Sequence, residues 1–246
     1  YSAPAAPTSA VAERTANNYA RLTWATSSTT MAPVEQVELL RQSNNNAWSS
    51  NPSTLNTPSG SAGFSNLAEG SRYRWRVTTK NRDAVGSPRD SNWVYMRPRP
   101  VANVELKRSG SNLVVSWVSL NAVDYGNFRI FHNGTQVAVM GATDRSATIT
   151  SPDPGVSHQV EVQAYYGGLS AARGSSNTVQ LLAPPLAPTN LSPDGGYQVA
   201  ATSVPLSWTH NSVDGSDQTA YELQVRRAGT TTWTTYTGTT AETRNI

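Results

Sequence analysis

The sequence predicts an all-β protein made of tandem Greek-key β-sandwiches, with the third sandwich incomplete within the 246 residues. Short runs of alternating apolar and polar residues recur along the chain, separated by turn residues at intervals of about 8–12 positions, which is typical of small sandwiches. No stretch keeps a helical period over about ten residues. A motif that ends in tryptophan also occurs three times, as LTW at 22–24, VSW at 115–117 and LSW at 206–208.

The three tryptophans divide the chain into repeats. Trp24, Trp117 and Trp208 are 93 and 91 residues apart, which is the length of a small domain rather than of a solenoid repeat. The strand that carries each tryptophan follows a proline-rich entry. We therefore expect three separate modules, which are module 1 over residues 1–98, module 2 over 99–183 and module 3 over 184–246.

Module 1 shows the alternation of a sandwich in order along the chain. Strands are expected at 19–24, 37–41, 73–79 and 93–96, with Phe64 and Leu67 leading into the third of these. Successive side chains of a strand point to opposite faces, so each of these strands is expected to bury one face and expose the other.

Module 2 contains a strong hairpin signal. Alternating runs flank Asn133-Gly134 within residues 127–139, and this pair suits a type I′ turn because both central positions need positive φ. The remaining strands of the module are expected at 113–117, 147–150, 158–165 and 178–182.

Module 3 begins like the other two modules and then stops. Alternating residues occur at 221–226 and Trp233 follows, but Ile246 lies about where a fifth strand is expected. An open sandwich exposes strand edges and an apolar face. We therefore expect either that the polypeptide continues past Ile246 or that another subunit donates the two remaining strands.

The stretch GSRYRWRVTTKN in module 1 alternates arginines with aromatic or apolar residues. On a strand, Arg72, Arg74 and Arg76 share one face, and the residues between them share the buried face. The arginines are expected to form a solvated ladder, with Glu38 as a cross-strand partner and Trp93 stacked on a guanidinium. In the alternative, the three arginines and Trp93 form a contact surface for a neighbouring protein. Nucleic acid is disfavoured because the other modules do not repeat the arginines.

The late half of module 1, NLAEGSRYRWRVTTKNRDAVGSPRDSNW, resembles a fibronectin type III domain. Tyr73, three residues after Gly70, matches that family's tyrosine corner, and in module 2 His158 stands at this position after Gly155. The resemblance implies chained sandwiches over nearly the whole chain. The core residues expected for the three modules are Trp24, Trp117, Trp208, Tyr73, His158 and Tyr221.

Composition limits the classes of partner. The net charge is +3 and cysteine is absent, so disulfides and thiolate metal sites are excluded. No block of like charges occurs, which argues against nucleic-acid binding, and no run of about 18 apolar residues occurs, which argues against membrane insertion. No signal peptide is visible at the N-terminus, and the chain begins without methionine, so we expect that it is trimmed or processed.

The sequence contains no recognisable catalytic motif. His132, His158 and His210 are not in metal-ligand spacing, no serine lies in a Gly-x-Ser-x-Gly motif, and no glycine-rich phosphate loop is present. We therefore expect no enzyme activity, no cofactor and no metal. Asp214 and Asp217 offer oxygen ligands for calcium, but a polar loop in which Gln218 anchors the backbone is the favoured interpretation.

Trp48 and Trp233 occupy matching positions after the third strand of their modules. An exposed indole can serve as a platform for a glycan, but recurrence in two modules favours a packing role.

Module 3, from APTNLSPDGG to the segment that contains Trp233, resembles fibronectin type III-like segments in tail proteins of bacteriophages, especially those of high-GC actinobacterial hosts. The resemblance implies a non-enzymatic virion component of the tail or tail fibre, in which sandwiches act as spacers and docking surfaces. Its partners would be other virion subunits, including copies of itself, and a host cell-surface glycan. The alternatives are a noncatalytic region of a secreted bacterial glycoside hydrolase and a cell-surface adhesin, both extracellular.

Overall fold

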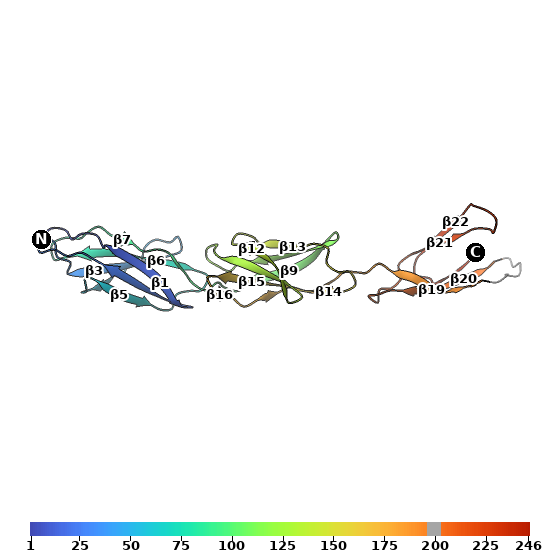
Figure 1. The fold of residues 1–246 in the computed structure, drawn as a ribbon, viewed down its shortest axis with the longest axis horizontal. Coiled ribbons are helices and arrows are strands. Elements are labelled where there is room, and N and C mark those ends of the chain that lie inside the picture. The colour runs from blue at the N-terminus through green and yellow to red at the C-terminus, as the bar shows by residue number, and fades with distance from the viewer. Residues whose placement is uncertain (196–202) are drawn as a thin grey trace. The chain divides into compact units, whose positions relative to one another are not determined.

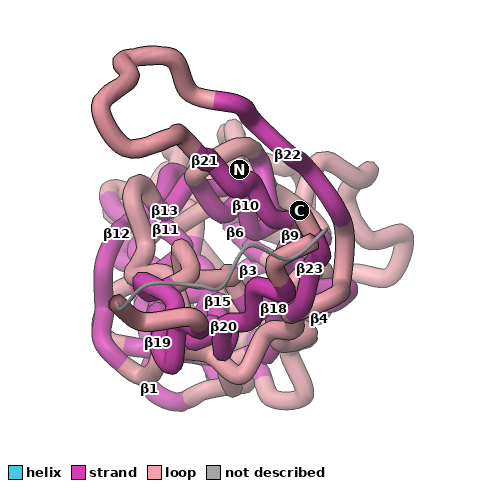
Figure 2. The backbone as a smooth tube through the Cα atoms, turned by 90° about the vertical axis from the view of Figure 1, so that its right-hand side faces the viewer, coloured by secondary structure: helices cyan, strands magenta, loops and turns pink. Residues whose placement is uncertain are grey.

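The computed structural model describes residues 1–195 and 203–246, and the regular elements in these two ranges are all β-strands. Figure 1 shows the strands in order along the chain, and Figure 2 shows strands and loops without a helix in the described part. The all-β class and the tandem sandwich architecture expected from the sequence are therefore confirmed.

Module 1 has the two sheets of a Greek-key sandwich. One sheet has the order β1-β2-β5, from β1 (Ser9–Ala16), β2 (Tyr19–Ala25) and β5 (Gly60–Phe64). The other has the order β4-β3-β6, from β4 (Ser53–Leu55), β3 (Gln36–Ser43) and β6 (Arg72–Lys80), with β7 (Arg89–Asp90) and β8 (Val94–Tyr95) also paired to β6. Because β2 pairs with β5 and β3 pairs with β6, the chain crosses from one sheet to the other after β2, after β4 and after β5.

Module 2 repeats this arrangement. One sheet has the order β13-β10-β9, from β13 (Ser146–Ile149), β10 (Asn112–Val118) and β9 (Ala102–Ser109). The other has the order β12-β11-β15-β16, from β12 (Thr135–Gly141), β11 (Asn127–His132), β15 (Val160–Tyr166) and β16 (Leu169–Ser170), with β17 (Gly174–Ser175) on β15. A short pair joins β14 (Ser157–His158) to β18 (Val179–Gln180).

The hairpin predicted in module 2 is confirmed. β11 ends at His132 and β12 begins at Thr135, so Asn133 and Gly134 form a two-residue turn. Their φ angles are 47° and 84°, both in the left-handed region that a type I′ turn requires.

Module 3 has five described strands. One sheet has the order β19-β20-β23, from β19 (Leu186–Ser192), β20 (Pro205–Asn211) and β23 (Thr243–Asn245), and the other pairs β21 (Tyr221–Val225) with β22 (Thr234–Gly238). In modules 1 and 2 the strands equivalent to β21, which are β3 and β11, have a second neighbour in β6 or β15. Among the described residues, β21 pairs with β22 alone.

An aromatic pair joins the two sheets of each module. Phe64 and Trp75 have ring centroids 4.8 Å apart in module 1, and Trp117 and Phe128 are 5.3 Å apart in module 2. In module 3 the Trp208 ring lies 4.7 Å from that of Tyr221. Removing a large side chain of this kind from water contributes about 1.5–3 kcal/mol, so these pairs are major parts of each core.

The contacts within the chain define two compact units. The first consists of Tyr1–Thr150 with Gln159–Asn177, and the second of Ser151–His158 with Thr178–Ile246. The first unit therefore contains all of module 1 and most of module 2. The module boundaries near residues 98 and 183 stay predictions.

Candidate interaction surface

The arginine strand β6 separates its residues by face, as its alternation predicts. Tyr73, Trp75 and Val77 are 7%, 0% and 0% exposed, whereas the arginines between them are half-buried on the outer face of the sheet. β6 lies between β3 on one side and β7 and β8 on the other, so the arginines occupy the middle of this face.

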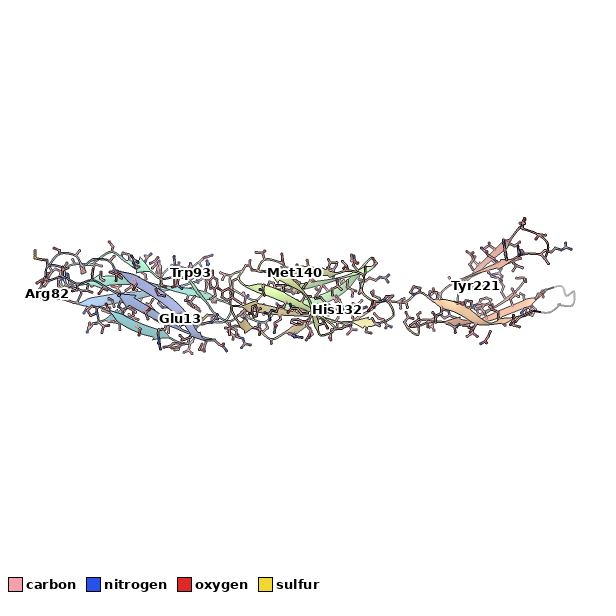
Figure 3. All side chains as sticks on the ribbon, viewed as in Figure 1. Glu13, Arg82, Trp93, His132, Met140 and Tyr221 are labelled. Carbon is pink, nitrogen blue, oxygen red and sulfur yellow. The ribbon has the colours of Figure 1, made fainter. Side chains whose placement is uncertain are left out.

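Two tryptophans interleave with the three arginines. The guanidinium carbon of Arg72 is 4.2 Å from the Trp93 ring centroid, and that of Arg74 is 4.7 Å from the same ring. Arg74 also lies 5.1 Å from the Trp48 ring, and Arg76 lies 4.4 Å from it. We call these five residues the arginine–tryptophan ladder; Trp93 is labelled at the surface of module 1 in Figure 3. Each such cation–π contact contributes about 0.5–1 kcal/mol where it is solvent-exposed.

Hydrogen bonds to neutral groups fix two of the ladder's guanidiniums. Arg72 donates from Nη2 to Asn45 Oδ1 at 2.7 Å and from Nη1 to Tyr95 Oη at 3.2 Å. Arg74 donates from Nε to Gln42 Oε1 at 2.6 Å. These bonds hold the guanidinium planes without neutralising their charges.

Asp90 is a carboxylate that contacts the ladder. It accepts two hydrogen bonds from Arg76, at 2.7 and 3.0 Å, and its Oδ2 lies 3.7 Å from Arg74 Nη1. The hydrogen bond to Asp90 raises the pKa of the Arg76 guanidinium above its ordinary value. Glu38, the partner expected from the sequence, forms an ion pair with Lys80 instead. That expectation was wrong because Glu38 lies opposite Thr78, close to the Lys80 end of β6.

The two proposed glycan platforms differ in exposure. Trp48 is half-buried within the ladder, whereas Trp233 is 51% exposed and has the guanidinium of Arg226 at 4.8 Å from its ring. Each indole is thus in contact with an arginine. Their roles in glycan binding stay predictions.

Most of the expected core residues lie in the interior. Trp24, Trp117 and Trp208 are 4%, 3% and 9% exposed. Tyr221 is only half-buried, contrary to its assignment to the core. Its strand has one described neighbour, and its ring contacts Trp208 while its hydroxyl accepts a hydrogen bond from Arg244 Nη1 at 3.2 Å.

Modules 1 and 2 use the corner position with different chemistry. The hydroxyl of Tyr73 accepts a hydrogen bond from Ala68 N at 3.0 Å, five residues upstream. His158 is 1% exposed, and its Nε2 donates to Asp153 O at 2.9 Å, also five residues upstream. The histidine thus ties the loop to the strand as the tyrosine does, with the donor on the side chain.

The loop that contains Asp214 is organised by hydrogen bonds to the backbone. Asp214 accepts from Ser216 N at 2.9 Å and from Ala183 N at 2.6 Å. The hydrogen bonds from Ser216, followed by that from Ala183, lower the pKa of Asp214 to about 2. Gln218 donates to Thr239 O and Ala241 O, as the loop-anchor interpretation predicts. No group of three or more His, Cys, Asp or Glu side chains that suits a metal ion occurs in the described part of the chain.

A tyrosine cluster joins modules 1 and 2 within the first compact unit. The rings of Tyr95, Tyr125 and Tyr166 lie 5.1–5.3 Å from one another. Tyr125 donates to Met96 O at 2.9 Å, and burial of its phenol raises the pKa of Tyr125 above the ordinary value. We call these three residues the tyrosine junction.

Hydrogen bonds to backbone carbonyl groups reinforce the tyrosine junction. Arg14 donates to Tyr95 O at 2.8 Å in module 1 and to Gly167 O at 3.1 Å in module 2. Arg97 donates to Ser170 O at 3.0 Å, and Ala122 N donates to Gly70 O at 2.8 Å. The sequence analysis did not predict this site. The feature that could have indicated it is the position of Tyr95 and Tyr166 at the ends of strands β8 and β15.

No helix in the described ranges is long and apolar enough to cross a membrane.

Comparison with known proteins finds solved structures that are similar to the chain, but no matching family model and no matching curated protein. Among solved structures it is similar to the FN1–FN3 domains of chicken CNTN1, with 16% identity, a TM-score of 0.42, and coverage of 99% of this chain and 88% of that one. It is also similar to a segment of two fibronectin type III domains from chicken tenascin, with 15% identity, a TM-score of 0.38, and coverage of 71% and 98%. The fold described above rests on the strand pairing of the chain itself.

Proposed function

We propose that the chain is a non-enzymatic structural and adhesive protein of fibronectin type III-like sandwiches, and that it is a component of a bacteriophage tail or tail fibre. Its modules act as spacers that set reach, and their outer faces dock other virion subunits or a host-surface glycan. The proposal extends to association with further copies of the chain.

The tyrosine junction is the observation that carries the proposal. A spacer that transmits position must resist bending between its modules, and flexible linkers do not do this. Here three buried or half-buried aromatic rings and hydrogen bonds from Arg14, Arg97 and Tyr125 join two successive sandwiches. Contacts that stiffen the joint between two domains suit a mechanical role better than a catalytic one.

The ionisable groups also support a non-enzymatic role. Several carboxylates are held in ion pairs at the surface, such as Glu38 with Lys80, Asp90 with Arg76 and Glu161 with Arg173. Asp214, whose pKa is lowered, is engaged with backbone N–H groups. A general acid or base needs a carboxyl group that is free to exchange a proton with a substrate, and these carboxylates are instead engaged with cationic side chains or backbone N–H groups.

Gold-labelled antibody against the purified chain tests the virion assignment. Labelling of tails in electron micrographs of phage particles is the expected result. Label that is absent from particles but present on the bacterial surface would support the adhesin instead. A protein recovered from culture supernatant in covalent linkage with a glycoside hydrolase domain would support the accessory region.

A further inference from the structure

We propose that the arginine–tryptophan ladder is a binding site for an acidic polysaccharide, in which the guanidiniums bind sugar carboxylates and the indoles contact the sugar rings. This inference names a ligand for the adhesive part of the proposed function and rests on that part. It does not depend on whether the chain belongs to a virion.

The first argument is charge. The ladder carries three guanidiniums, and the carboxylate of Asp90 accepts from Arg76 at 2.7 and 3.0 Å and lies 3.7 Å from Arg74. Glu38 is paired with Lys80 and does not offset the ladder. The three guanidiniums share the single charge of Asp90, so the ladder keeps an excess of about two positive charges, and Arg72 and Arg74 lie on adjacent outward positions of one strand, roughly 7 Å apart.

The second argument is the orientation of Arg74. Its guanidinium contacts both Trp93 and Trp48, and its Nε is bonded to Gln42, so the plane of the group is held in place. Its Nη1 stays 3.7 Å from Asp90, which is beyond hydrogen-bond distance, and the side chain is 30% exposed. A guanidinium fixed in this way loses little side-chain entropy when a carboxylate binds to its outer nitrogens.

The third argument separates a sugar from an acidic protein. A protein carboxylate needs the guanidinium alone, whereas a uronic acid presents both a carboxylate and an apolar C–H face. Trp48 and Trp93 are half-buried with two guanidiniums against each ring, so the part of each indole that stays exposed beside the guanidiniums is what the ladder offers to the apolar side of a sugar. The alternation of rings and charges along β6 suits a polymer that repeats them.

Binding to three polymers tests the proposal with the full chain, by affinity electrophoresis and calorimetry. Polygalacturonate carries sugar rings and carboxylates, its methyl ester carries the rings without the charge, and polyglutamate carries the charge without the rings. We expect binding to polygalacturonate that weakens as salt is raised, and at least tenfold weaker binding to the other two. Equal binding of polyglutamate, equal binding of the ester, or binding of none of the three would each overturn the proposal.

A matched pair of variants locates the site. Arg74→Gln removes one charge from the ladder and is expected to weaken binding to polygalacturonate about tenfold or more, as for loss of a charge-assisted hydrogen bond. Arg21→Gln removes the same charge from β2, in the other sheet of module 1, where Arg21 is exposed, and is expected to leave binding within about twofold. Equal effects of the two variants would show general charge attraction and refute the site.

If Arg74→Gln does not fold, the binding of the three polymers to the unaltered chain decides alone. Tail labelling without polygalacturonate binding would leave the virion assignment in place and remove this ligand.

Discussion

The substitution Tyr125→Phe tests whether the tyrosine junction makes modules 1 and 2 one cooperative unit. The change keeps the ring contacts with Tyr95 and Tyr166 and removes the hydroxyl that donates to Met96 O at 2.9 Å. Tyr125 is 7% exposed and Met96 is 0% exposed, so the carbonyl loses its partner in a site with little access to water.

The expected cost follows from that burial. A buried hydrogen bond contributes about 0.5–1.5 kcal/mol, and a buried acceptor left without its donor costs about 1–3 kcal/mol. We expect the free energy of unfolding to fall by about 1–2 kcal/mol. Because the bond joins two modules, the unaltered protein is expected to unfold both in one calorimetric transition, and the variant is expected to separate them.

Tyr165→Phe is the matched control. It makes the same chemical change on β15, one position from Tyr166, at a half-buried ring that contacts Arg129 at 3.6 Å. Urea unfolding and differential scanning calorimetry on both variants are the assays, and the control is expected to change stability by less than about 0.5 kcal/mol. Equal effects of the two substitutions, or separate transitions for modules 1 and 2 in the unaltered protein, would refute the role of the junction.

Three further predictions concern the core, the hairpin and one carboxylate. Ile130→Val should lower the free energy of unfolding by about 0.5–1.5 kcal/mol in chemical denaturation, because Ile130 is 0% exposed; no loss would show that the site repacks. Gly134→Val should destabilise the module 2 hairpin by about 1 kcal/mol or more, because its φ of 84° is strained for a β-branched residue, whereas Gln136→Val, an exposed β12 position, should not. The folded-state pKa of Asp214, lowered to about 2, lies below its unfolded value of about 3.9, so its contribution to stability is present above pH 4 and is lost as the pH falls through 2. NMR of the Ala183 amide between pH 5 and 1.5 checks this, and an Asp214→Asn variant with the same profile would contradict it.

The sequence predicted the architecture because the architecture depends on local signals. The repeated tryptophan motif, the alternation of β6 and the Asn133-Gly134 pair each specify their structure within a few residues, and each predicts a feature that the structure contains. The two faces of β6 follow from a period of two alone.

The contacts across the sheets could not be predicted in the same way. Asp90 pairs with Arg76 across 14 residues, and Tyr95 meets Tyr166 from another module. Such partners depend on strand register and on the angle between modules, which a single sequence does not encode in any short pattern. Strand adjacency alone places Glu38 beside the arginines, whereas the register of β3 and β6 places it near Lys80.

The corner of module 2 has a consequence for chimeric proteins. The atom that meets the corner side chain is the carbonyl of Asp153 in module 2 and the amide of Ala68 in module 1. A tyrosine hydroxyl can both donate and accept a hydrogen bond, so the corner of module 1 suits either loop, whereas the Nε2–H of His158 is a donor that suits the loop of its own module. A loop moved from module 2 into module 1 is therefore expected to keep a corner hydrogen bond more readily than a loop moved the other way.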